Sequence, residues 1–182
     1  MQKDTGPLAV RLRDFAEADL PTMGQALTDP RVTAYYGLST EAGTPQAIAR
    51  EQLDWLRELQ ALEEGWWQAI VAAEDGALVG GLGAYDRDDD GDSADLGFWL
   101  LPAYWGRGAM RQALRQFAPR VFARLRLHSL VAYVEPVNTA SAQVLRACGF
   151  QHEGLLRECT RRGSAYVSLE RYSLLRSELP PA

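Results

Sequence analysis

The alternation of hydrophobic and polar positions along the chain predicts four helices. Between residues 110 and 125 apolar side chains recur at helical spacing, while arginine and glutamine occupy the opposite face. The stretch 44–62 begins with a capping threonine followed by proline at the first helical position, which favours a second long helix. A shorter helix is predicted over 14–29, with a loop after it. Another is predicted over 138–148, where an asparagine can cap the start and a glycine follows the end.

The remaining apolar runs are short and rich in β-branched or aromatic residues, which is typical of strands. They cover residues 8–13, 66–73, 78–85, 94–101, 128–134, 150–158 and 165–175. The helix at 110–125 connects the fourth and fifth of these strands as a crossover, so those two should run parallel. The pattern predicts an α/β (α+β) fold, a mixed and mostly antiparallel sheet of six to seven strands flanked by about four helices.

Length and composition narrow the class of protein. The 182 residues are 47% hydrophobic and 24% charged, without repeats or a Pro/Gly linker, so one domain over residues 1–182 is expected. No apolar run approaches the ~20 residues that cross a bilayer. The first residues lack a basic region followed by an apolar stretch, so we expect no signal peptide, no membrane partner and a cytoplasmic location.

The net charge and the few potential metal ligands bear on which partners the protein can bind. The net charge of −5 argues against nucleic-acid binding, which relies on a basic surface, and is mildly consistent with a cationic partner such as an amine. Cys148 and Cys159 are expected to be reduced thiols. With only His128 and His152 in addition and no Cys/His cluster, no metal site is expected.

The segment that carries candidate chemistry joins the fourth strand to the long helix. Its sequence, PAYWGRGAM over residues 102–110, has Gly106 and Gly108 where a strand passes into a helix. Glycines allow a tight turn, and free N–H groups at a helix start favour an anion such as a phosphate. A dinucleotide fingerprint is disfavoured because Arg111 occupies the third glycine position, and no P-loop Gly-Lys-Ser/Thr is present. A purely structural turn remains the alternative for the bare motif.

Two longer runs extend this motif, GFWLLPAYWGRGAMRQAL and VEPVNTASAQVLRACGFQHEG. They resemble the GNAT superfamily of N-acetyltransferases, and within it the Rim-type branch that includes ribosomal-protein N-terminal acetyltransferases. The matching features are the Tyr-Trp-Gly-basic-Gly turn over 104–108, Asn-x-x-Ser over 138–141, Gly-Phe at 149–150 and Glu-Gly at 153–154. The chain departs from the branch at Met110, where a small residue is usual, and at Ser168, where an aspartate is common.

The resemblance implies a GNAT fold with the fourth and fifth strands splayed apart, and acetyl-CoA (coenzyme A) as the cofactor. The pantetheine arm would lie along the fourth strand, and the pyrophosphate would bind amides of the glycine turn. The cofactor-binding residues implied are Leu96, Gly97, Phe98, Trp99, Leu100, Leu101, Trp105, Gly106, Arg107, Gly108, Ala109, Met110, Arg111, Asn138 and Ser141.

Amine acetylation requires an acid, a base and a place for the acceptor. Ser141 is the candidate acid or hydrogen-bond donor to the leaving thiolate, with an unpartnered first-turn residue as the alternative. Asp95 and Glu135 are the candidate bases, although either can be a surface charge. Asn138 is expected to cap its helix and also to contact the pantetheine.

Aromatic residues are the candidates for the wall of the acceptor site. Tyr35 and Tyr36, in a loop between the first two helices, are the favoured pair, whereas Trp55, Trp66 and Trp67 are more typical of core positions. A protein or peptide α-amine is the favoured acceptor. A small amine (antibiotic, amino acid or polyamine) and a non-catalytic acyl-CoA-binding module are the alternatives. The oligomeric state stays open, with a homodimer as the commonest arrangement.

Overall fold

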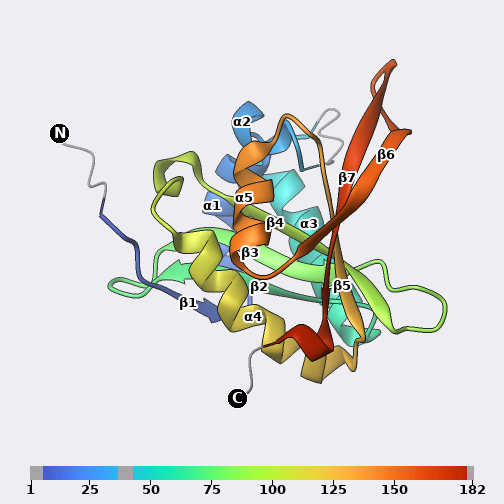
Figure 1. Ribbon diagram of the computed structural model, residues 1–182. Helices are drawn as coiled ribbons and strands as arrows, with labels where there is room; N and C mark the ends of the chain where they lie inside the picture. Colours follow the sequence, from blue (N-terminus) through green and yellow to red (C-terminus); the bar gives the residue numbers. More distant parts are fainter. Residues whose placement is uncertain (1–5, 37–42, 180–182) are drawn as a thin grey trace.

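Seven strands form one mixed sheet in the computed structural model, which describes residues 6–36 and 43–179 (Figure 1). The strand order is β1-β2-β3-β4-β5-β7-β6. All neighbouring strands are antiparallel except β4 and β5, which are parallel as predicted. The strands are β1 (Val10–Arg13), β2 (Trp66–Ala72), β3 (Leu78–Tyr85), β4 (Ser93–Leu100), β5 (Ser129–Val134), β6 (Gln151–Arg162) and β7 (Ala165–Leu175).

Helices cover both faces of this sheet and create two apolar layers. The helices are α1 (Leu20–Leu27), α2 (Pro30–Thr33), α3 (Pro45–Ala61), α4 (Ala109–Leu125) and α5 (Thr139–Ala147), with 3-10 turns at Glu17–Asp19, Pro102–Tyr104 and Arg176–Glu178. Phe117 of α4 and Leu130 of β5 belong to one buried cluster, whereas Leu53 of α3 and Trp67 of β2 belong to the other. Strand β2 is buried along its whole length because helices pack on both of its faces.

The starts of three helices depend on residues that the sequence identifies. Thr44 Oγ1 accepts a hydrogen bond of 3.2 Å from the Ala47 N–H at the start of α3. Asn138 Oδ1 accepts one of 3.2 Å from the Ser141 N–H at the start of α5. Gly108 precedes α4 in the left-handed conformation. These contacts confirm the predicted caps of α3 and α5 and the turn before α4.

Two predicted elements differ from the structure. The helix expected from residue 14 begins as a 3-10 turn at Glu17, because the Asp19 carboxylate accepts from the Ala16 N–H at 2.8 Å and holds the preceding residues outside the helix. The loop expected after residue 30 contains α2, which Asp29 caps by accepting from the Arg31 N–H at 2.9 Å.

Strand β6 is longer than the predicted 150–158 and contains a bulge. Its pairing with β7 shifts between Leu156 and Thr160, and Glu158 adopts a φ of 48°. The Glu158 N–H donates to Ser168 Oγ at 2.9 Å, so this serine supports the bulge and the strand resumes beyond it. The β6–β7 hairpin extends away from the rest of the sheet (Figure 1).

Cys148 and Cys159 are free thiols, as expected. Among residues 6–36 and 43–179, no helix is both long and apolar enough to span a membrane.

Candidate active site

A cavity of about 1190 Å³ connects the splayed strands to the helices α2 and α3. One end, here called the donor end, is lined by β4, the turn before α4 and the start of α5. The other, here called the acceptor end, is lined by α2, α3 and aromatic residues of β2 and β3. The acceptor end includes Arg31, Tyr35, Tyr36, Glu51, Gln52, Trp55, Trp67 and Tyr85.

The donor end exists because β4 and β5 pair over only part of their length. Parallel pairing covers Ser93–Asp95 of β4 and stops at the Asp95–Val131 pair. Beyond this point β4 has no β5 partner, and its remaining residues line the cavity: Leu96, Gly97, Phe98, Trp99 and Leu100. The structure therefore has the predicted splay, and the unpaired edge of β4 offers backbone groups to a ligand.

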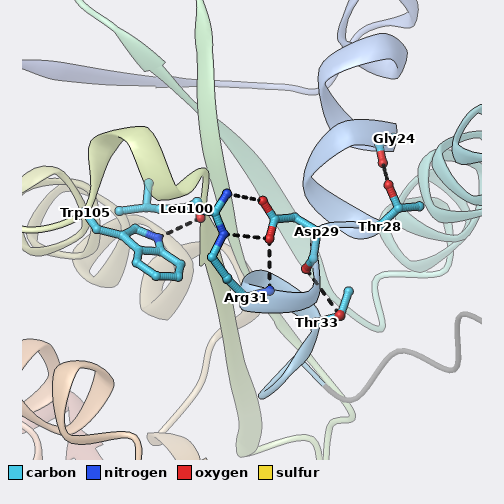
Figure 2. Close-up of polar contacts among 7 residues, drawn as sticks. All are labelled: Gly24, Thr28, Asp29, Arg31, Thr33, Leu100 and Trp105. Carbon is cyan, nitrogen blue, oxygen red and sulfur yellow. Dashed lines mark hydrogen bonds and ion pairs between the residues drawn. The ribbon is translucent and has the colours of Figure 1, made fainter. Parts of the chain in front are cut away.

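The end of β4 is held by contacts outside the strand ladder. The Trp105 indole Nε1–H donates to the Leu100 carbonyl at 2.9 Å, and both residues line the cavity (Figure 2). Leu101 lies outside the lining, and its N–H donates to the Val79 carbonyl at 2.9 Å. The backbone groups of β4 that remain for a ligand therefore lie before the Leu100 carbonyl.

The glycine turn presents backbone N–H groups to the donor end. Gly106 and Gly108 both have a φ of 75°, a backbone conformation that residues other than glycine rarely adopt. The first intrahelical bond of α4 runs from the Gln112 N–H to the Gly108 carbonyl, so the amides of Ala109, Met110 and Arg111 lie in the first turn, before that bond. This arrangement fits a phosphate, which favours a helix N-terminus and its dipole.

Side chains around this turn divide into two groups. Ala109 and Met110 are buried in the core cluster while also lining the cavity. Arg111 lines the donor end and brings positive charge there. Arg107 lies outside the lining: its Nε donates to the Gly6 carbonyl at 2.9 Å, and its own carbonyl accepts from the Leu8 N–H at 3.1 Å. Arg107 thus ties the N-terminal segment to the turn.

The start of α5 lies across the donor end from the glycine turn. Asn138 and Ser141 both line the cavity, and the Asn138 cap holds the first turn that carries Ser141. Within the described residues, the Ser141 hydroxyl has no hydrogen-bond partner. It therefore retains its capacity to donate a hydrogen bond to a ligand.

The two candidate bases have different surroundings. Asp95 faces the same side of β4 as Gly97 and Trp99, which line the cavity, although Asp95 itself does not. Burial, reinforced by the nearby Asp86 charge, raises the pKa of Asp95 from 3.8 to about 6, and Arg171 opposes this rise.

Glu135 also lies outside the lining, and only 11% of its side chain is exposed. It is ion-paired with Arg162 at the end of β6. The guanidinium of Arg162 also lies 5.7 Å from the centre of the Tyr35 ring. These contacts connect the β6–β7 hairpin to the end of β5 and to the segment after α2, which is a structural role for Glu135.

Aromatic rings form the floor of the acceptor end. Trp67 lies 6.2 Å from Tyr36, 6.1 Å from Trp55 and 6.0 Å from Tyr85, measured between ring centres. Burial raises the pKa of Tyr36 and of Tyr85. Trp66 points to the opposite face of the sheet, where it stacks on Phe117 at 5.3 Å and does not line the cavity.

A row of two glycines allows Trp67 to reach this position. Trp67 is paired with Gly83 across β2 and β3, and Gly83 with Gly97 across β3 and β4. A Cβ on Gly83 would lie 2.1 Å from Trp67 Cγ, and one on Gly97 would lie 2.9 Å from Cη2 of the same indole. The indole therefore extends over two neighbouring strands to the unpaired part of β4.

Sequence reasoning missed the polar residues of the acceptor end. Arg31, Glu51 and Gln52 line the cavity from α2 and α3. Figure 2 shows Arg31 bound through two guanidinium nitrogens to the Asp29 carboxylate, at 3.0 and 2.6 Å. The available signal was Gln52, a polar residue four positions after Ile48 and four before Leu56 on the apolar face of α3.

Comparison with known proteins identifies the family. The model of the acetyltransferase (GNAT) domain matches residues 9–151. The uncharacterized N-acetyltransferase p20 of Bacillus licheniformis is 28% identical over 174 residues, covering 96% of each chain. The ribosomal-protein-S5-alanine acetyltransferase of Vibrio fischeri superposes with a TM-score of 0.79 at 22% identity, covering 94% of this chain and 96% of that one. The spermidine N-acetyltransferase of Vibrio cholerae, solved with CoA and spermine, superposes with a TM-score of 0.79 at 18% identity. The match covers 93% of this chain and 97% of that one.

The chain belongs to the GNAT family and is an N-acetyltransferase that uses acetyl-CoA. Acetyl-CoA supplies an acetyl group activated as a thioester. The residues of the donor end fit this molecule: the unpaired edge of β4 for its extended arm, the amides after Gly108 with Arg111 for its phosphates, and Asn138 with Ser141 on the facing helix.

Proposed function

We propose that this enzyme acetylates the α-amine at the N-terminus of a protein or peptide, by direct attack of that amine on the acetyl donor. The charge around the cavity carries the proposal. Among the described residues, the lining contains one acidic side chain, Glu51, and two basic ones, Arg31 and Arg111. A polyamine carries several positive charges and is better matched by a cluster of carboxylates. A peptide N-terminus carries one amine and neutral peptide groups, which suits this lining.

The properties of Asp95 agree with such an acceptor. A carboxylate whose pKa is about 6 is largely ionised at neutral pH but is only a modest base. A peptide α-amine, with a reference pKa of ~8, is partly neutral under the same conditions, whereas a lysine-type amine near ~10.4 is almost fully protonated. Asp95, directly or through water, accepts the proton that the α-amine loses.

The other roles follow from the donor end. The unpaired backbone of β4 binds and orients the donor, and its N–H groups stabilise the negative charge that develops on the acetyl oxygen. The Ser141 hydroxyl donates a hydrogen bond or a proton on the side of the sulfur. The turn at Gly106 and Gly108 anchors the phosphates and so fixes the position of the reacting end.

Transfer to a small amine is the second candidate, since the fold is shared with a spermidine N-acetyltransferase. Membership in the Rim-type branch, the one-domain organisation, the homodimer and the cytoplasmic location remain predictions from the sequence.

A parallel assay of thiol release distinguishes the two acceptor classes. Acetyl-CoA is supplied with peptides that have a free N-terminal alanine or serine, with the same peptides blocked at the N-terminus, and with spermidine. We expect a kcat/KM for the free peptides at least tenfold above that for spermidine, and no activity on the blocked ones. Preference for spermidine would assign the enzyme to small amines instead.

A further inference from the structure

A buried carboxamide at the acceptor end has no partner in the protein. Gln52 of α3 is only 8% exposed and lines the cavity. Among residues 6–36 and 43–179 no group forms a hydrogen bond with its side chain. Its Nε2 and Oε1 therefore keep two donor and two acceptor positions that the protein does not use.

The polar atoms of this amide open onto the cavity, because they are not among the fully buried side-chain atoms that lack a hydrogen bond in the described residues. Nearly all polar groups inside folded proteins have a hydrogen-bond partner, and a group that faces a cavity can find its partner in water or in a ligand. Gln52 is on the face of α3 that carries Ile48 and Leu56, where an apolar side chain is the ordinary choice. A ligand in the cavity that forms the missing hydrogen bonds would account for the glutamine.

The surroundings indicate the chemistry of that ligand. Trp67, 4% exposed, forms the aromatic floor, and its Nε1–H also has no hydrogen-bond partner within the described chain. That indole N–H is itself fully buried, so the unused polar groups that face the cavity are the donors and acceptors of the Gln52 carboxamide. A protonated polyamine carries donors only, so it cannot accept a hydrogen bond from Gln52 Nε2. A peptide group carries a carbonyl oxygen and an N–H, which complement the two ends of a carboxamide.

We propose that the Gln52 carboxamide binds the first peptide group of the acceptor, donating from Nε2 to its carbonyl oxygen. The inference rests on the proposed N-terminal acetylation and names the residue that makes it selective. Binding this group next to the amine holds the α-amine in one orientation, while an amine without a neighbouring carbonyl leaves the amide unpartnered. A site built around such a hydrogen bond discriminates strongly against ligands that lack it.

Two substitutions test this role. Gln52→Met keeps the length of the side chain and removes the hydrogen-bonding groups, whereas Gln52→Glu keeps the shape and replaces the donor with a negative charge. Gln46→Met is the matched control, because Gln46 is in the same helix but exposed and outside the cavity. Each protein is assayed with an N-terminal alanine peptide and with the same peptide carrying an alkene in place of its first peptide bond.

For wild type, the alkene should lower kcat/KM about tenfold or more, the size expected when a buried hydrogen bond is lost. Gln52→Met should lower kcat/KM for the normal peptide about tenfold, mainly through KM, and should bind acetyl-CoA like wild type. With the alkene peptide the same variant should lose little more, because the bond is already absent. Gln52→Glu should lose peptide activity and gain activity on 1,5-diaminopentane, and Gln46→Met should match wild type.

Independent, multiplicative losses from the variant and the alkene would overturn the role of Gln52 while leaving N-terminal acetylation intact. Failure of the proposed function gives a different result, because the wild-type enzyme would then acetylate polyamines and show no activity on the normal peptide. If Gln52→Met unfolds, the same cycle with Gln52→Ala, which removes the amide without adding a charge, decides the question.

Discussion

Replacing Asp95 with asparagine should stabilise the protein at alkaline pH while impairing catalysis. The folded-state pKa of this carboxyl is raised, mainly by burial, from 3.8 to about 6. Between about pH 4 and pH 6 the folded protein therefore binds more protons at this site than the unfolded chain does. Stability consequently falls as pH rises through this window, and above it the buried charge costs its full amount. Asparagine resembles the protonated acid and removes that cost.

The size of the effect follows from the pKa. At ~1.4 kcal/mol for each pKa unit, a rise from 3.8 to about 6 corresponds to at most ~3 kcal/mol. Part of the carboxylate reaches solvent, which screens its charge, so ~1–2 kcal/mol is the realistic gain. For a chain of 182 residues, each kcal/mol moves Tm by about 2–4 °C. Asp95→Asn should thus raise Tm by about 4 °C at pH 8.

Thermal unfolding of both proteins, monitored by circular dichroism at pH 8 and at pH 4, measures this difference in Tm. At pH 4 the folded protein keeps the proton on Asp95, so most of the Tm difference should disappear. In the acetyl-transfer assay at pH 8 the variant should lose about 10²-fold or more in kcat, the usual contribution of a general base. Equal Tm values at pH 8, or the same gain at both pH values, would refute the assigned burial of the charge.

Three further substitutions address other parts of the site. Glu135→Gln removes one partner of the ion pair with Arg162 and should lower the free energy of unfolding by ~1–3 kcal/mol, measured in urea. If this variant lost far more kcat than Asp95→Asn, Glu135 would be the base instead. Gly108→Ala places a side chain at a φ of 75°, so we expect ~1–2 kcal/mol of destabilisation and weaker acetyl-CoA binding in calorimetry, and unchanged affinity would contradict this. In Gly83→Ala the new methyl group collides with Trp67, which should lower the free energy of unfolding by ~1–3 kcal/mol. The KM for the acceptor should rise with little effect on acetyl-CoA affinity. An unchanged KM would argue against Trp67 as the floor of the acceptor end.

Much of the donor end was predictable because β4, the glycine turn and the start of α4 follow one another directly in the sequence. A strand, a turn with two glycines and a helix occur within one continuous segment, and each has a strong local signal. The bounds of β3 and β7 also agree with the prediction, and a glycine turn, at Gly76 and at Gly163, precedes each of these strands. Helix α2 was missed because a single turn carries too little periodicity, although its Asp29-Pro30 start is a recognisable cap.

The acceptor end could not be predicted in the same way, because strand register decides which of its residues meet. Trp66 and Trp67 are equivalent by composition, and only the alternation of β2 sends one to the α4 face and the other to the cavity. The space that Trp67 occupies depends on Gly83 and Gly97 being cross-strand neighbours, which is a property of the pairing. Gln52 is distant in the sequence from these strands and joins them only through the packing of α3 on β2.

The position of the acetyl group on a peptide product distinguishes an α-amine acceptor from a side-chain acceptor. A peptide with a free N-terminal alanine and an internal lysine is incubated with the enzyme and acetyl-CoA, and tandem mass spectrometry locates the acetyl group. We predict a single acetyl group on the N-terminal α-amine. Acetylation of the lysine side chain, or an unmodified peptide under conditions in which spermidine is acetylated, would contradict it.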